Sequence, residues 1–101
     1  MEIKVSGRHI EVTPAIREYA SEKALKLPRY FDRVQGIDVV INHGDHNHYS
    51  VEIITNVERT DPFIARASGL DLYACIDDAI DKMERQLTDH KQKLRNRKHN
   101  V

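Results

Sequence analysis

Lysine and arginine side chains gather in two segments of this chain, and their chemistry is that of phosphate binding. The first segment carries Lys23, Lys26, Arg29 and Arg33, and the second carries Lys82, Arg85, Lys91, Lys93 and Arg95. Such cations supply the salt-dependent contacts that proteins make with a nucleic-acid backbone. If the two segments lie side by side, we expect them to merge into one positive strip that binds RNA or DNA.

A plainer interpretation is that these residues form a solvated helix surface. Pairs such as Glu22 with Lys26 and Asp81 with Arg85 have the i,i+4 spacing that stabilises isolated helices. A binding role is favoured by the one-sided charge of residues 71–98, in which basic residues dominate from Lys82 onward. The earlier part has no lysine or arginine and carries Asp71, Asp77, Asp78 and Asp81.

Three histidines crowd one short polar segment, where they could bind a metal ion. His43, His46 and His48 lie beside Asp45, and imidazole and carboxylate groups are zinc ligands. However, their spacing matches no fixed metal motif and no cysteine is close by. We therefore favour an exposed polar turn and expect no metal and no other cofactor.

An enzyme is not expected from the remaining reactive side chains. Carboxylates at Asp77, Asp78 and Asp81 suit the N-terminal half of a helix for structural reasons alone. The chain has no Gly-rich phosphate loop, no G-x-S-x-G and no H-E-x-x-H. The single cysteine, Cys75, is expected to be a small buried hydrophobe.

Size and composition indicate one small soluble domain. The chain has 101 residues and a formal net charge of zero, so any binding of polyanions must come from charges that are segregated on the surface. No apolar run is long enough for a membrane span, and no secretory signal is visible. One unpaired cysteine fits the reducing cytoplasm, which is the expected location.

The elements that must position the basic residues follow from apolar periodicity. A first helix is predicted from Thr13 to Leu27. Thr13 is a good N-cap and Pro14 suits the first helical position, whereas Pro28 disfavours helix at the residue before it. Four strands are predicted over residues 2–6, 34–42, 49–57 and 63–68.

The last helix is predicted to start at Asp71, which can cap it, and to keep an apolar face as far as Leu94. We therefore expect a domain over residues 1–94 and a frayed basic tail over residues 95–101. The order β-α-β-β-β-α requires the first two strands to be parallel, because a helix crosses between them. The predicted fold class is α+β, a two-layer domain in which both helices cover one face of a four-stranded mixed sheet.

Long stretches of this sequence resemble a known family. The segments VSGRHIEVTPAIREY, KLPRYFDR and DLYACIDDAIDKMERQLTDHKQKL are similar to the short form of bacterial ribosome hibernation-promoting factor, a relative of ribosome-associated inhibitor. The similarity runs from Met1 to about Lys93. It implies a fold like that of a double-stranded-RNA-binding domain, in agreement with the order of elements above.

The resemblance also implies a function. Members of this family bind the small ribosomal subunit in the channel that messenger and transfer RNA would occupy, block translation and preserve idle ribosomes under stress. The expected partners are the small subunit with its rRNA and whole ribosomes. A separate ribosome modulation factor acts beside the short form where one exists, and inactive ribosomes can pair. No membrane or DNA partner is implied.

Carried over to this chain, the implied rRNA-binding residues are Lys23, Lys26, Arg29, Arg33, Lys82, Arg85, Lys91 and Lys93. The chain departs from the family pattern at Asp89, which puts a negative charge among them, and at Pro28. Two other hypotheses stay open at this point. One is a free-standing binder of double-stranded RNA, and the other is a metal protein that uses His43, His46 and His48.

Overall fold

The computed structural model describes the backbone of residues 1–99 and the side chains of residues 1–96. The strands pair in the order β1-β2-β3-β4. β1 is parallel to β2, and the other two pairs are antiparallel. The elements are β1 (Glu2–Arg8), α1 (Pro14–Ala24), the 3₁₀ helix η1 (Leu27–Arg29), β2 (Val34–His43), the 3₁₀ helix η2 (Asp45–Asn47), β3 (Tyr49–Val57), β4 (Phe63–Gly69) and α2 (Leu72–His99).

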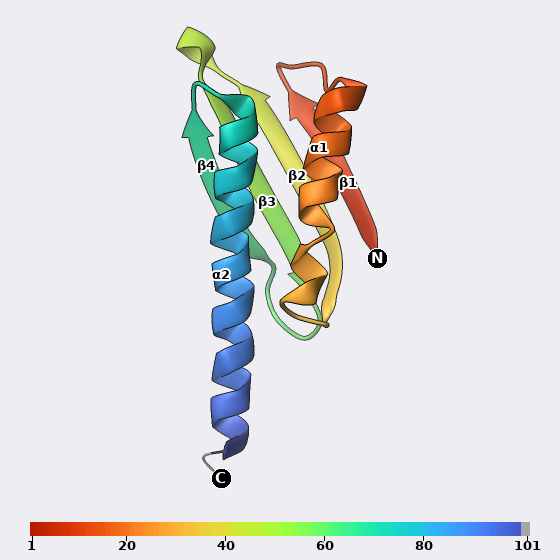
Figure 1. The fold of residues 1–101 in the computed structure, drawn as a ribbon, viewed down its shortest axis with the longest axis vertical. Coiled ribbons are helices and arrows are strands. Elements are labelled where there is room, and N and C mark those ends of the chain that lie inside the picture. Colours follow the sequence, from red (N-terminus) through yellow and green to blue (C-terminus); the bar gives the residue numbers. More distant parts are fainter. Residues whose placement is uncertain (100–101) are drawn as a thin grey trace.

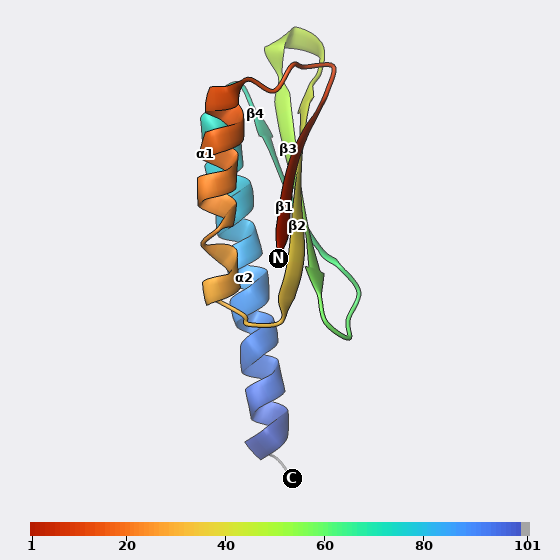
Figure 2. The same cartoon turned by 90° about the vertical axis from the view of Figure 1, so that its right-hand side faces the viewer.

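Both long helices lie on the same face of the sheet, and the other face is uncovered (Figure 1, Figure 2). The predicted α+β class, the four-stranded mixed sheet and the two-layer arrangement are therefore confirmed. The likeness to a double-stranded-RNA-binding domain stays a prediction. No described helix combines the length and apolar character needed to cross a bilayer.

The core lies between the helix layer and the sheet, as strand alternation requires. Ile37, Val39 and Ile41 of β2 are buried, as are alternate residues of β3 from Val51 to Val57. Alternation places these side chains on one face because successive residues of a strand point to opposite sides. The apolar face of α2 covers them with Leu72, Ile76, Ile80, Met83 and Leu87.

Helix α1 starts where predicted but ends earlier. The Ile16 N–H donates to Thr13 Oγ1 at 3.2 Å, which confirms the N-cap, and Pro14 is the first helical residue. The helix was predicted to reach Leu27, but it ends at Ala24. The chain then forms η1, which buries Leu27 and leads to the buried Phe31. The regular pattern cannot run through Pro28, because proline has no N–H to donate to the Ala24 carbonyl, and the burial of Leu27 and Phe31 favours the turn that replaces it.

Helix α2 is capped as predicted and projects beyond the sheet (Figure 1). Asp71 Oδ1 accepts hydrogen bonds from the N–H groups of Tyr73 (3.0 Å) and Ala74 (3.3 Å). The helix passes Leu94 without a break and reaches His99, which includes residues 95–99 of the expected tail. Residues 100 and 101 lie outside the described residues, and the division of the chain at residue 94 stays a prediction.

Candidate nucleic-acid interface

The groove between α1 and α2 holds two of the predicted RNA contacts beside acidic residues. Lys23 Nζ lies 3.7 Å from Asp77 Oδ1. Lys26 lines the same groove, together with Asp81 and Glu84 of α2. Lys23 of α1 and Lys26, which lies between α1 and η1, thus face carboxylates, which reduce the attraction of this groove for phosphate.

Tyr19 contacts both the Asp77 carboxylate and the Lys23 ammonium group of this groove. Its hydroxyl donates to Asp77 Oδ1 at 2.7 Å, and its ring lies 5.4 Å from Lys23 Nζ and packs edge-on against Tyr73 at 4.8 Å. The hydrogen bond to Asp77, helped by burial and by the charge of the same carboxylate, raises the pKa of Tyr19 to about 12. Farther along the groove, the negative charge of Glu84 raises the pKa of Tyr30.

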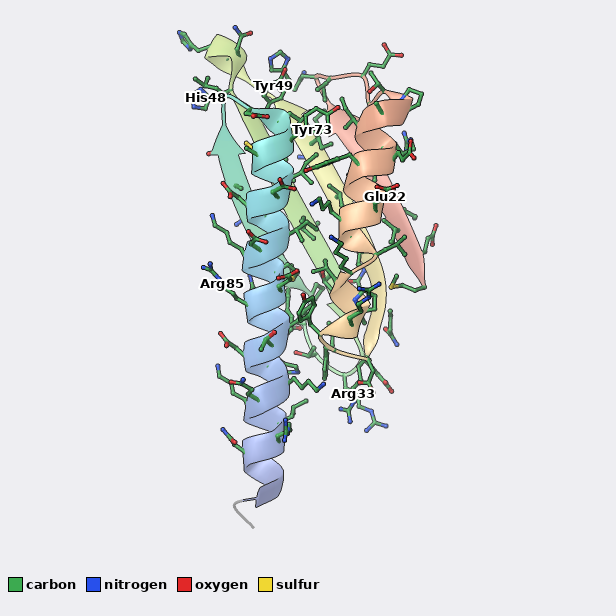
Figure 3. The ribbon with its side chains drawn as sticks, in the orientation of Figure 1. Glu22, Arg33, His48, Tyr49, Tyr73 and Arg85 are labelled. Carbon is green, nitrogen blue, oxygen red and sulfur yellow. The ribbon has the colours of Figure 1, made fainter. Side chains whose placement is uncertain are left out.

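Lys82 and Arg85 lie away from this groove. Lys82 Nζ donates to the backbone carbonyl of Arg66 in β4 at 2.8 Å. Arg85 points away from α1 (Figure 3). Arg66 itself pairs with Glu52 at 2.7 Å.

Within the part of the chain that the structure describes, the two basic segments therefore do not merge along their whole length into the single positive strip that we expected. Lys23 and Lys26 lie apart from Lys82. The physical reason is that neighbouring residues of α2 point to different sides of the helix. Successive helical residues are about 100° apart, so Asp81 turns toward α1 while Lys82 turns toward β4. Carboxylates fill the gap between Lys23 and Lys26 on one side and Lys82 and Arg85 on the other.

The two basic segments do converge at one place. Arg33, which lies just after η1, meets Lys91 and Arg95 of α2 around a small notch of about 200 Å³. Phe31 and Leu94 add apolar lining to this notch, and one carboxylate, Asp32, also lines it. We call Arg33, Lys91 and Arg95 the basic notch.

The cations of the basic notch are available to a ligand. Among the side chains that the structure describes, none of the three forms an ion pair. The guanidinium carbon of Arg33 lies over the Phe31 ring, 6.0 Å from its centroid. Figure 3 shows Arg33 below η1, beside the projecting half of α2. Chain segments about 60 residues apart thus bring three positive charges to one place.

Two predicted residues lie outside both groupings. Arg29 ends η1 and is exposed. Lys93 is exposed and lies two positions from both Lys91 and Arg95, so it points to the opposite flank of α2. Neither has an ion-pair partner among the described side chains. They can add phosphate contacts, but they do not belong to the basic notch.

The histidine turn is not arranged as a metal site. His43 stacks on Tyr49, with ring centroids 4.6 Å apart and planes at 12°. No group of three or more candidate ligands converges anywhere in the portion that the structure covers. Nearby, Cys75 is buried, as predicted, and its Sγ lies 4.0 Å from the Tyr49 carbonyl oxygen. Burial raises the pKa of the Cys75 thiol.

Two residues near the cations were not predicted from the sequence to bind RNA. They are Arg95 and Arg66. Arg95 was counted among the basic residues of the last helix but not carried into the rRNA-binding set. Arg95 is four residues after Lys91, so both lie on one flank of α2. This spacing could have indicated that Arg95 belongs with Lys91. Arg66 gave no signal, because only the packing of α2 on β4 brings it beside Lys82.

Comparison with known proteins is consistent across sequence and structure. Residues 3–95 match the family described as Sigma 54 modulation protein / S30EA ribosomal protein. The ribosome hibernation promoting factor of Escherichia coli is 40% identical over 95 residues, which cover 94% of this chain and 98% of that protein. The protein of the same name from Azotobacter vinelandii is 36% identical over 93 residues, which cover 92% of this chain and 85% of that protein.

Two solved structures have the same fold. The N-terminal domain of Thermus thermophilus Protein Y matches with a TM-score of 0.79 and 33% identity, covering 89% of this chain and 99% of that one. A ribosomal subunit interface protein from Coxiella burnetii matches with a TM-score of 0.82 over 91% of this chain and 99% of that one. At 23% identity, the second match supports the fold alone.

Proposed function

Because this chain belongs to the Sigma 54 modulation protein / S30EA ribosomal protein family, we propose that it is a ribosome hibernation factor that binds the small ribosomal subunit. In this proposal it occupies the channel for messenger and transfer RNA in the cytoplasm of a stressed cell. It blocks translation there and keeps ribosomes inactive, either singly or in pairs. Its role is binding and steric exclusion, without catalysis.

The observation that carries the proposal is the basic notch. Arg33, Lys91 and Arg95 are exposed and lie without ion-pair partners among the described side chains. Arginine binds phosphate oxygens through two donors at once, and lysine adds a point charge. A folded rRNA surface is recognised mainly through its shape and its phosphates. The basic notch meets this requirement at the end of the molecule where α2 projects.

The shape of the molecule suits steric exclusion. Its principal extents are 52 × 24 × 19 Å, and the long axis follows α2 (Figure 1). Phosphate contacts at the basic notch would anchor the projecting half of α2, while the two-layer body fills space beside it. RNA ligands that need the same space would then be excluded without any chemical step.

Co-sedimentation with ribosomes across a salt series tests this proposal. We expect binding to small subunits and whole ribosomes that weakens steeply as salt rises. Reversing two charges of the basic notch, Arg33→Glu with Lys91→Glu, should weaken binding and reduce the slope of log K against log salt by about two, roughly one for each lost phosphate contact. The matched control is Lys4→Glu with Arg8→Glu in β1, which makes the same change in net charge away from the notch.

The outcomes separate the function from the site. Ribosome binding that is unchanged in the Arg33→Glu, Lys91→Glu variant would exclude the basic notch as the contact surface. A protein that does not co-sediment with ribosomes at low salt, or that does not reduce translation in a cell-free extract, would contradict the function itself. A gel shift with a plain RNA duplex tests the open hypothesis of a general duplex binder, and we expect no shift.

A further inference from the structure

The sheet has two free edges, and the helices above them reach over both. β1 and β4 are the outer strands, so each has one side without a neighbouring strand among residues 1–99. The exposed backbone groups of such an edge can pair with a strand of another molecule, and proteins commonly block this. In this protein, side chains of both long helices reach the backbone of β1 and β4.

Two side chains of α2 bind the backbone of β4. Lys82 Nζ donates to the carbonyl oxygen of Arg66 at 2.8 Å, and Gln86 Nε2 donates to that of Ile64 at 2.8 Å. Lys82 and Gln86 are four residues apart, so they leave the same flank of the helix. Ile64 and Arg66 are alternate residues of the strand, whose carbonyls point to the same side. The helix thus occupies two successive carbonyl groups along β4.

The same arrangement recurs at the opposite edge. Arg17 of α1 donates from Nη1 to the carbonyl oxygen of Val5 in β1 at 2.9 Å. Each long helix therefore packs on the sheet with its apolar face and binds the neighbouring outer strand with a polar side chain on its flank. Two unrelated segments of sequence reach the same solution, which argues against coincidence.

We propose that Arg17, Lys82 and Gln86 guard the two edges of the sheet against strand addition by a second copy of this chain. A second copy is the natural partner, because β4 can pair antiparallel with itself. A twofold axis at Ala65 would place Ile64 of one copy opposite Arg66 of the other, and these are the residues whose carbonyls are now occupied. Ile64 is already 43% exposed on the uncovered face, so pairing would also bury apolar surface.

This assignment gives Lys82 a different role from the rRNA contact predicted from the sequence. Its ammonium group is already bound to a backbone carbonyl, whereas Lys91 of the basic notch has no such partner among the described residues. Edge protection does not rest on ribosome binding, and the two roles respond differently to substitution. Replacing Lys82 by glutamine removes the charge but keeps a side-chain donor.

The test compares guard variants by analytical ultracentrifugation over a range of protein concentrations. Lys82→Met with Gln86→Leu removes both donors at β4 and keeps the bulk of both side chains. The matched control, Arg85→Met with Gln92→Leu, likewise removes one cation and one amide, at α2 positions that form no hydrogen bond to a strand in the described structure. We expect the guard variant to shift from monomer toward a doubled mass as concentration rises, while the control and Lys82→Gln stay monomeric.

Hydrogen exchange then locates the new contact. The backbone amides of residues 64 and 66 should become protected in the associated guard variant and remain unprotected in the control. A guard variant that folds normally and stays monomeric at every concentration overturns the proposal, as does association that leaves these amides unprotected. If the double variant does not fold, Lys82→Met and Gln86→Leu are measured singly, and each should associate at a higher concentration.

Discussion

At the scale of single residues, Thr55 is a polar group in an apolar place. It lies on the inward face of β3, is completely buried, and its hydroxyl has no hydrogen-bond partner in the described structure. Burial of a hydroxyl without a partner costs free energy, because the group loses its bonds to water. Valine has nearly the same shape and suits a strand at least as well.

We therefore expect Thr55→Val to stabilise the protein by about 1 kcal/mol. Urea denaturation followed by circular dichroism measures this change. The contrasting variant is Thr13→Val, which removes the oxygen that accepts the Ile16 N–H and should cost about 1 kcal/mol as a lost N-cap. A loss of stability in both variants would mean that the Thr55 hydroxyl has a partner after all.

Tyr19 makes the free energy of unfolding depend on pH in the alkaline range. The folded state holds its phenolic proton more tightly than the unfolded chain does, because the pKa is raised from 10.0 to about 12. The stability that the Tyr19 hydroxyl contributes is therefore fully present below pH 10 and is lost as pH rises toward 12. The difference in unfolding free energy between the protein and its Tyr19→Phe variant should shrink across this interval.

An ultraviolet titration measures the same ionisation directly. The difference in tyrosinate absorbance between the protein and Tyr19→Phe isolates Tyr19, and its midpoint should lie about two units above the ordinary value of 10.0. A midpoint at the ordinary value would show that the bond to Asp77 does not persist in solution.

At the scale of elements, local signals predicted the fold well. Thr13 and Asp71 cap the two helices as their residue types indicate, and the alternation of β2 and β3 placed the core correctly. Each of these features depends only on residues that are near in sequence, so it can be predicted from one amino-acid sequence. Pro28 signalled the end of α1 locally, but the exact end at Ala24 was not predicted, because it also depends on the burial of Leu27 and Phe31, which is a tertiary constraint.

The candidate site was harder to predict for the same reason. The basic residues were found, but spacing along one helix does not show which flank faces a neighbouring element. Asp81 faces Lys26 across the groove while Lys82 reaches the carbonyl of Arg66. The meeting of Arg33 with Lys91 depends on how the turn after η1 packs against α2, and no local pattern encodes that packing.

The turn from β1 into α1 gives a prediction at this scale. A Cβ added at Gly7 would lie 2.6 Å from the carbonyl oxygen of Ile10 and 2.9 Å from a methyl carbon of Val12. Because backbone cannot move aside cheaply, we expect Gly7→Ala to lower the free energy of unfolding by roughly 1–3 kcal/mol.

Gly44 supplies the control for that substitution. A Cβ there would meet its nearest atom, the carbonyl oxygen of His48, at 3.7 Å, so Gly44→Ala should have little effect. Denaturant unfolding of the two variants side by side gives the comparison. Equal stability of both would show that the β1–α1 connection relaxes away from Gly7.

At the scale of the whole molecule, a net charge of zero conceals an uneven distribution. Cations gather where α2 projects, and carboxylates gather in the groove between the helices. Long-range attraction to a polyanion depends on such separation rather than on the sum of charges. The acidic groove therefore limits how much of the helix layer can face RNA.

Neutralising the groove should extend the RNA-binding surface. In the variant Asp81→Asn with Glu84→Gln, Lys26 would no longer face two carboxylates, and we expect tighter ribosome binding at low salt. The gain should fade as salt rises, because surface charges are screened. Ribosome co-sedimentation at low and high salt measures it, with Asp38→Asn and Glu52→Gln on the uncovered sheet face as the control. An equal gain in the control would mean that only net charge matters.

The burial of Cys75 has a practical consequence. Its thiol is shielded by the packing of α2 on the sheet, and the same burial raises its pKa and disfavours the reactive thiolate. A fluorophore attached through a newly introduced surface cysteine would therefore label one position without first removing the natural one. The native thiol meanwhile becomes available to alkylating reagents when the domain opens, so the molecule carries an internal reporter of its own unfolding.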